Sequence, residues 1–214
     1  MIYWVLLIII AVIAYVLGSM SSEVIASNYI FHANLRRLGK GNVGLSNFRR
    51  VYGIKGLILL LLVEVLRDLL VILIGGWLLG IKEQVLVGRL FAGFCLIMGR
   101  QWPVFYDLRG THATICLVVT AFCADISIGV ITLLIITAVI WVTRYVSLAT
   151  VAGAFVMVIT CVLVLEETLI ILLGVCIAAV IFVRHIPAMS RVLNGTETKL
   201  SLEEDISYKF DQRF

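Results

Sequence analysis

Charged residues are scarce in this chain. Only 14% of its 214 residues are Asp, Glu, Lys or Arg, whereas 62% are hydrophobic, and the mean hydropathy is +1.13. Soluble domains carry about 25% charged residues, so the composition excludes an ordinary water-soluble fold. Proline occurs only twice, and the apolar runs are continuous rather than alternating, which favours helices over a β-barrel. The sequence therefore predicts an all-α integral membrane protein.

The motifs of metal and nucleotide chemistry are also missing. The five cysteines lie in apolar runs without a CxxC pair, and we interpret them as small buried hydrophobes. The three histidines lie far apart in the sequence, and neither HExxH nor a Walker motif occurs. We therefore expect no metal, no cofactor and no nucleic-acid partner.

Seven apolar segments predict seven transmembrane helices in one membrane domain, residues 1–200, followed by a polar cytosolic tail at 201–214. The segments are 2–20, 56–79, 85–99, 112–124, 126–143, 148–165 and 168–184. The boundaries between 112 and 143 are set only by Asp125, which marks the expected turn. Met1–Met20 is expected to be a span rather than a signal peptide, because it lacks a basic start and a clear cleavage site.

Basic residues lie almost entirely in alternate connections. One set of connections holds Arg36–Lys55, Arg100–Arg109, Arg144 and the tail, whereas the other set has only Lys82 as a cation. The positive-inside rule then predicts an N-terminus outside the cell and a C-terminus in the cytosol, so that the polar motifs share the cytosolic face.

The most polar of these motifs runs from Arg36 to Asn47. Three glycines, at 39, 41 and 44, permit a tight turn whose backbone N–H groups can form an anion site, with cations and amides among them. One interpretation is a phosphate-binding loop; the other is a flexible basic loop near anionic lipid head groups.

Ionisable residues also occur inside an apolar segment. Glu64, Arg67 and Asp68 have the spacing of one helix face, and such groups in a span are by default functional. The alternative interpretation is a structural one, in which the three charges neutralise one another. A transporter or channel is a third and weaker hypothesis, because no inverted repeat accompanies these charges.

Two later stretches carry further candidates. Arg100 and Arg109 flank an aromatic loop that leads to His112, where a helix is expected to begin. Arginines suit phosphate or carboxylate, and His112 suits an anion or acid–base role, although interfacial anchoring would explain these residues as well. His185 ends the seventh segment, and its alternative explanation is a snorkelling basic helix end.

The order of these pieces resembles the bacterial membrane acyltransferase family that makes lysophosphatidic acid from acyl phosphate and glycerol 3-phosphate. The likeness covers roughly residues 15–199. It rests on Gly18-Ser19-Met20, Arg36, Gly39-Lys40-Gly41-Asn42-Val43-Gly44-Leu45-Ser46-Asn47, Arg50, Gly99-x-x-Trp102-Pro103-Val104-Phe105, Arg144-Tyr145-Val146-Ser147-Leu148, His185 and Asn194-Gly195-Thr196-Glu197. The resemblance implies seven spans, an outside N-terminus and a site in the bacterial cytoplasmic membrane.

Several positions depart from the family pattern. Lys40 replaces a Ser and Ser46 a Thr in the first motif, while Arg100 replaces a His and His112 a Lys in the second. Arg109 replaces another Lys, and Ala188 stands where the family has Asn. Charge is often kept where the side chain is not, so the resemblance supports the fold more strongly than the activity.

The resemblance implies catalytic roles for Ser19, Asn47 and His185. The phosphate-binding set that it implies is Arg36, Gly39, Lys40, Gly41, Asn42, Gly44, Ser46, Arg50, Arg100, Arg109 and His112. The expected partners are acyl phosphate and glycerol 3-phosphate, or another anionic lipid, within the membrane lipids. The alternative is a catalytically degenerate homologue that binds lipid or phosphate or serves as a subunit of a membrane complex.

Overall fold

The computed structural model describes residues 2–38, 44–106, 108, 110–197 and 199–200, with Arg36 and Ser46 described by their backbone only. All the regular secondary structure of the described residues is helical. Its long helices are α1 (Ile2–Ser19), α3 (Leu45–Gly80), α4 (Val85–Gln101), α5 (Thr114–Ala124), α6 (Ile126–Thr143), α7 (Val146–Val164) and α8 (Thr168–Leu193). Shorter turns are α2 (Ser22–Ile25), η1 (Ala26–Ile30), η2 (Leu35–Arg37) and η3 (Val104–Tyr106).

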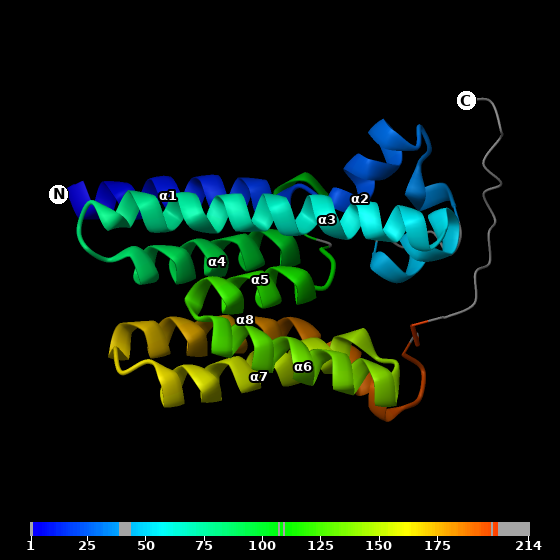
Figure 1. Ribbon diagram of the computed structural model, residues 1–214. Coiled ribbons are helices and arrows are strands. Elements are labelled where there is room, and N and C mark those ends of the chain that lie inside the picture. Colours follow the sequence, from blue (N-terminus) through cyan, green and yellow to red (C-terminus); the bar gives the residue numbers. More distant parts are fainter. Residues whose placement is uncertain (1, 39–43, 107, 109, 198, 201–214) are drawn as a thin grey trace.

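The long helices run roughly along one axis and alternate in direction. In Figure 1, α1 and α3 form one side of the molecule, α4 and α5 lie in the middle, and α6, α7 and α8 form the opposite side. Because the helices alternate, the described residues of the connections between α1 and α3, between α4 and α5 and between α6 and α7 gather at one end of the bundle, together with residues 194–197. We call this the polar end; the connections 81–84, 125 and 165–167 lie at the other.

Small residues bring α4 against its neighbours. A methyl group added at Gly99 would collide with the backbone oxygen of Tyr15 in α1, and one at Gly88 would collide with the backbone oxygen of Gly75 in α3. Close backbone approach through small residues is how membrane helices pack without a large hydrophobic driving force. This packing holds the end of α4 beside the end of α1.

Local signals set several helix ends. Asp125 is the N-cap of α6, and its carboxylate accepts a hydrogen bond of 2.7 Å from the backbone N–H of Ser127. The same helix ends at Arg144, whose φ of 61° lies in the left-handed region. The side-chain cap of Asp125 therefore explains why α6 begins directly after this residue.

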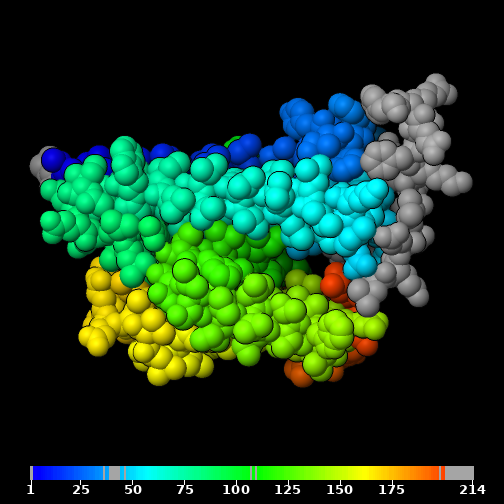
Figure 2. Space-filling model, in the orientation of Figure 1, coloured from blue at the N-terminus to red at the C-terminus, as the bar shows by residue number. Residues whose placement is uncertain are grey.

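A second, smaller core lies at the polar end. The segment 22–38 folds back on the first half of α3 and buries Phe48, Val51 and Tyr52, with the rings of Phe31 and Tyr52 stacked at 4.1 Å between centroids. Figure 2 shows these two segments forming a lobe at one end. Within this lobe α3 is interrupted at Gly53, whose φ of 69° and ψ of −170° are not helical.

Within the part of the chain that the structure describes, four helices are long and apolar enough to cross a membrane. They are α1, α6, α7 and α8, while α5 is a shorter apolar helix. Two helices extend beyond the apolar segments that marked them: α3 begins at Leu45 rather than near 56, and α8 continues past 184 to Leu193 with Pro187 inside it. These extensions carry polar residues to the polar end.

Candidate functional site

Buried charges form the centre of the polar end. The guanidinium of Arg100, at the end of α4, contacts Glu23 at 3.1 Å and also pairs with Glu64 of α3. All three side chains are buried, and Arg100 Nε donates to the backbone oxygen of His112 at 3.2 Å. Arg100 therefore joins three segments that are distant in sequence, and it is itself held by two carboxylates.

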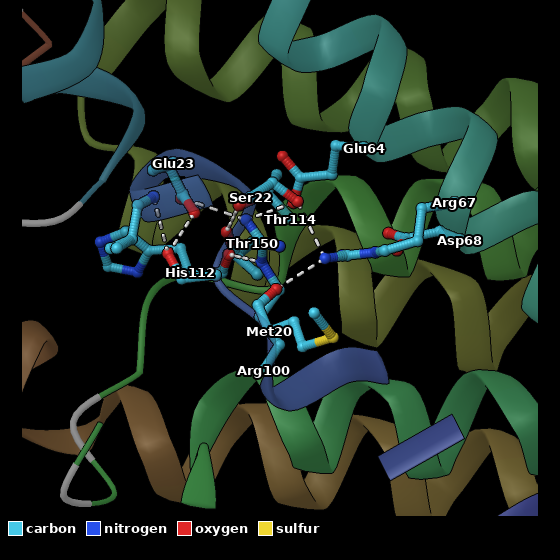
Figure 3. Close-up of polar contacts among 12 residues, drawn as sticks. Met20, Ser22, Glu23, Glu64, Arg67, Asp68, Arg100, His112, Thr114 and Thr150 are labelled. Atoms are coloured by element: carbon cyan, nitrogen blue, oxygen red, sulfur yellow. Dashed lines mark hydrogen bonds and ion pairs between the residues drawn. The ribbon is translucent and has the colours of Figure 1, made fainter. Parts of the chain in front are cut away.

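A second ion pair connects α3 to the chain just after α1. Arg67 contacts Asp68 at 2.7 Å, and its Nη1 donates to the oxygen of Met20 and to Oγ of Ser22, both at 2.8 Å. Figure 3 shows Arg67 reaching toward Met20 and Ser22, with Glu23, Glu64 and His112 drawn in the same polar cluster. Arg67 and Asp68 thus pair with each other, whereas Glu64 pairs with Arg100, so the three residues do not form the self-contained cluster of the structural interpretation.

Two histidines meet beside this cluster. Nδ1 of His112 lies 2.9 Å from Nε2 of His185, and the two rings are stacked with centroids 5.1 Å apart. Burial is the main cause that lowers the pKa of His112 to about 4, and the neighbouring His185 contributes to the same decrease. His112 is therefore neutral at pH 7, so it does not supply a standing positive charge for phosphate.

A third group of polar contacts joins the start of α7 to the segment after α8. The hydroxyl of Ser147 donates to Oε1 of Glu197 at 3.1 Å, and Nε of Arg191 donates to Oε2 at 2.6 Å. Ser147 is fully buried, whereas Arg191 is exposed. Arg184 of α8 also donates to the backbone oxygens of Gln101 and Gly110, which ties the 102–113 connection to α8.

The candidates of the first motif that the structure describes lie at the start of α3. Asn47 is buried in α3 and donates to the oxygen of Leu38 at 3.2 Å, which links the two sides of the 39–43 loop. Gly44 is the residue before α3, and Arg50 is half-buried on its second turn. Ser19 is buried, and its hydroxyl donates to the oxygen of Tyr15 within α1.

Some expected site residues cannot be described. Gly39, Lys40, Gly41, Asn42 and Arg109 lie outside the described residues. The backbone of Arg36 is in η2 and that of Ser46 is in the first turn of α3. Their roles stay predictions.

The structure adds polar residues that sequence reasoning did not select. Glu23 and Thr150 have no local motif to distinguish them, and Ser147 and Glu197 had been noted only as part of a resemblance. Thr150 hydrogen bonds to Thr114 at 2.5 Å, across α7 and α5. Only the tertiary fold brings these residues to the polar end. The sequence did carry one usable signal, because the positive-inside rule had already assigned the connections near them to one side of the membrane.

Comparison with known proteins gives a consistent family. A family model described as glycerol-3-phosphate acyltransferase matches residues 8–195. A glycerol-3-phosphate acyltransferase of Thermoanaerobacter sp. (strain X514) is 31% identical over 196 residues, which cover 92% of this chain and 96% of the relative.

Solved structures agree with this result. The crystal structure of PlsY (YgiH), an integral membrane glycerol 3-phosphate acyltransferase, in its glycerol 3-phosphate form is 25% identical, with a TM-score of 0.75 and coverage of 91% of this chain and 96% of that one. The form with lysophosphatidic acid has a TM-score of 0.76 at 23% identity and covers 94% and 99%, which supports the fold alone. The chain therefore belongs to the glycerol-3-phosphate acyltransferase family.

Proposed function

We propose that this protein transfers an acyl group from acyl phosphate to glycerol 3-phosphate and so forms lysophosphatidic acid for phospholipid synthesis. The observation that carries the proposal is the family match over residues 8–195, which spans all the connections of the polar end. The protein is a multi-pass protein of the bacterial cell membrane. A degenerate, non-catalytic homologue is not favoured by these relatives.

The chemistry makes modest demands on side chains. Acyl phosphate is an activated mixed anhydride, so the enzyme has to hold two phosphates, bring the glycerol hydroxyl to the carbonyl carbon and stabilise the developing oxyanion. The polar end offers buried hydroxyls, two histidines and several cations, described above, for these tasks. The acyl chain itself would lie between helices, in contact with lipid.

The phosphate sites are expected near the start of α3. The sequence 39–44 leads into the N-terminus of this helix, where backbone N–H groups favour an anion. Arg36 and Arg50 flank the loop in the sequence and would add positive charge. Asn47 supports this arrangement because its amide connects the helix to Leu38 on the other side of the loop.

The contacts of Arg100 favour a supporting role over direct phosphate binding. Its guanidinium already faces Glu23 and Glu64, and carboxylates around an arginine oppose the approach of a further anion. We therefore propose that Arg100 fixes the loop ahead of α5 through the oxygen of His112, while phosphate is held elsewhere at the polar end.

The membrane orientation is also a proposal. We propose that α1 and α3–α8 are seven spans of a single membrane domain, with the N-terminus outside and the polar end in the cytosol. Support comes from the charges: Arg49, Arg50, Arg144 and Arg184 lie at the polar end, whereas the other end has Lys82 among acidic residues. At about 1.5 Å per residue the continuous part of α3 after Gly53, residues 54–80, is about 40 Å long and already exceeds a hydrocarbon core of about 30 Å, so the turns before Gly53 extend beyond that core.

The test is acyl transfer by the purified protein, with lysophosphatidic acid measured by mass spectrometry. We expect the wild type to form the product and Asn47→Ala to form none, because the loop loses the contact that closes it. Lys82→Gln, at the exposed turn of the opposite end, is the matched control and should keep full activity. A normal product yield from Asn47→Ala would refute the role of the loop, and no product from the wild type would refute the proposed function.

A further inference from the structure

Arg89 is a cation that the proposed acyl transfer does not use. It is the fifth residue of α4, whose start lies at the end opposite the polar end (Figure 1). At about 1.5 Å per residue, Arg89 is about 6 Å inside the start of this helix. An ionisable side chain within a span is costly and almost always has a partner, so the partner of Arg89 has to be identified.

The protein itself gives the guanidinium of Arg89 few contacts. Nη1 donates to the backbone oxygen of Cys123 at 3.3 Å, near the end of α5, and the buried Nε has no hydrogen-bond partner among the described residues. No ion pair of the described residues includes Arg89, and the nearby carboxylate of Asp125 accepts from the N–H of Ser127 instead. A guanidinium carries five N–H donors, so most of the hydrogen-bonding capacity of Arg89 is left over.

The side chain of Arg89 lies against a glycine of α3, at the level of the membrane interface. A methyl group added at Gly76 would come within 2.7 Å of Cγ and 3.2 Å of Nε of Arg89, so the glycine makes room for this side chain. The next residue, Trp77, is 73% exposed, and Trp4 near the start of α1 is 68% exposed. Exposed tryptophans near helix ends mark the level of the lipid head groups, so Arg89 lies close to this level.

A half-buried cation without an acidic partner favours an anion from the bilayer. The phosphodiester of a glycerophospholipid lies at the boundary of the hydrocarbon core and offers two oxygens that match the guanidinium fork. An arginine that starts just inside the core reaches this boundary by snorkelling. Leu73 and Leu70 continue inward from Trp77 on α3, and both are exposed, which provides an apolar surface for the acyl chains of such a lipid.

We propose that Arg89 binds the phosphodiester of a phospholipid of the outer leaflet, between α3, α4 and the end of α5. This lipid is distinct from the substrates, because they are expected at the polar end. The assignment to the outer leaflet rests on the proposed membrane orientation, whereas the binding itself depends neither on that orientation nor on acyl transfer.

The test is the affinity of the full chain for phosphatidylglycerol after purification in detergent and removal of bound lipid. Native mass spectrometry measures the bound fraction, and the rise in Tm on addition of lipid measures the same affinity independently. Hydrogen bonds between charged groups correspond to a change in Kd of about 10–100-fold, so Arg89→Gln should weaken binding by this factor. Lys82→Gln, the same charge change on the exposed turn before α4, is the matched control and should bind as the wild type does. Equal affinities of the two variants would overturn the proposal.

A second variant displaces Arg89 without removing its charge. Gly76→Ala places a methyl group against Cγ and Nε of Arg89, so it should weaken binding of phosphatidylglycerol in the wild type but not in the Arg89→Gln background. Arg89→Lys keeps the charge but not the fork, so its affinity should lie between those of the wild type and Arg89→Gln. Additive effects of Gly76→Ala and Arg89→Gln would contradict a shared site.

Two further comparisons identify the ligand. Inorganic phosphate should leave the Tm unchanged, because it lacks acyl chains. A glycolipid with the same acyl chains but no phosphate should raise the Tm equally in the wild type and in Arg89→Gln, because it lacks the anion. A rise with inorganic phosphate that matches the rise with phosphatidylglycerol would overturn the assignment to a lipid, and an equal dependence of both lipids on Arg89 would overturn the assignment to a phosphodiester.

The alternative role of Arg89 is to cap α5 through the oxygen of Cys123. With this role alone, Arg89→Gln would lower the Tm of the lipid-free protein, and phosphatidylglycerol would raise the Tm of the wild type and of the variant equally; that result would overturn the proposal. Acyl transfer is not measured in these experiments. Absence of turnover in the wild type would therefore refute the proposed function and not the lipid site.

Discussion

Removal of the Arg100 charge should strongly destabilise the protein. In Arg100→Met the side-chain length is nearly kept, but Glu23 and Glu64, both fully buried, lose their shared cation. Breaking a buried ion pair by removing one partner costs about 3–5 kcal/mol of folding stability. For a chain of this size each kcal/mol lowers the Tm by about 2–4 °C, so the expected fall in Tm is about 6–20 °C. The bond to the oxygen of His112 is lost at the same time.

The assay is thermal unfolding in detergent, followed by tryptophan fluorescence. Lys82→Gln is the control, since an exposed substitution should change stability by no more than about 0.5 kcal/mol. Adding Glu64→Gln to Arg100→Met should restore part of the Tm, because one of the two stranded charges is then gone, and contacting charges couple by about 0.5–3 kcal/mol. If Arg100→Met unfolds at the temperature of the control, the buried cluster does not hold the polar end together.

Two further predictions concern packing and capping. Gly99→Ala should lower the Tm, because the added methyl group overpacks against the backbone of Tyr15 at a cost of about 1–3 kcal/mol. The control is Gly174→Ala, which should leave the Tm unchanged or raise it, because the nearest atom to its methyl group would be the sulfur of Cys161 at 3.8 Å. Equal Tm values for the two variants would contradict the close approach of α1 and α4. Hydrogen bonds from the hydroxyl and backbone N–H of Ser127 hold the pKa of Asp125 below its usual value. The cap therefore contributes its full stability above the pKa that the Asp125 carboxyl has in the unfolded chain, and this contribution is lost as pH falls through the lower pKa of the folded state. The Tm should consequently fall more steeply in acid for the wild type than for Asp125→Asn. Parallel Tm profiles would count against the cap.

The sequence was sufficient for the long helices but not for all their ends. Continuous apolar runs predict α1, α6 and α7 closely, because a membrane span has to be apolar on every side. The start of α3 at Leu45 was not expected, since its first turns are polar and gain their stability from the small core around Phe48. A tertiary contact, rather than hydropathy, decides where that helix begins.

For the site too, the sequence pattern predicts local placement, whereas only the tertiary fold reveals the partners. The spacing of Glu64, Arg67 and Asp68 predicts one helix face, but it does not reveal that Glu64 pairs with Arg100 while Arg67 turns to Asp68 and Met20. Glu23 was missed because its partner is 77 positions away in the chain. The histidine pair was hidden for the same reason: His112 and His185 are separated by 73 positions, and only the packing of α8 against the 102–113 connection brings them together.

The most direct test of the account follows both products of a single reaction. The purified wild-type protein, given acyl phosphate and glycerol 3-phosphate, should release inorganic phosphate and lysophosphatidic acid in equal amounts, and ³¹P NMR resolves both along with the donor. Without glycerol 3-phosphate neither product should form faster than in buffer. Phosphate release without lysophosphatidic acid, or no consumption of acyl phosphate by folded protein, would contradict acyl transfer as the function of this chain.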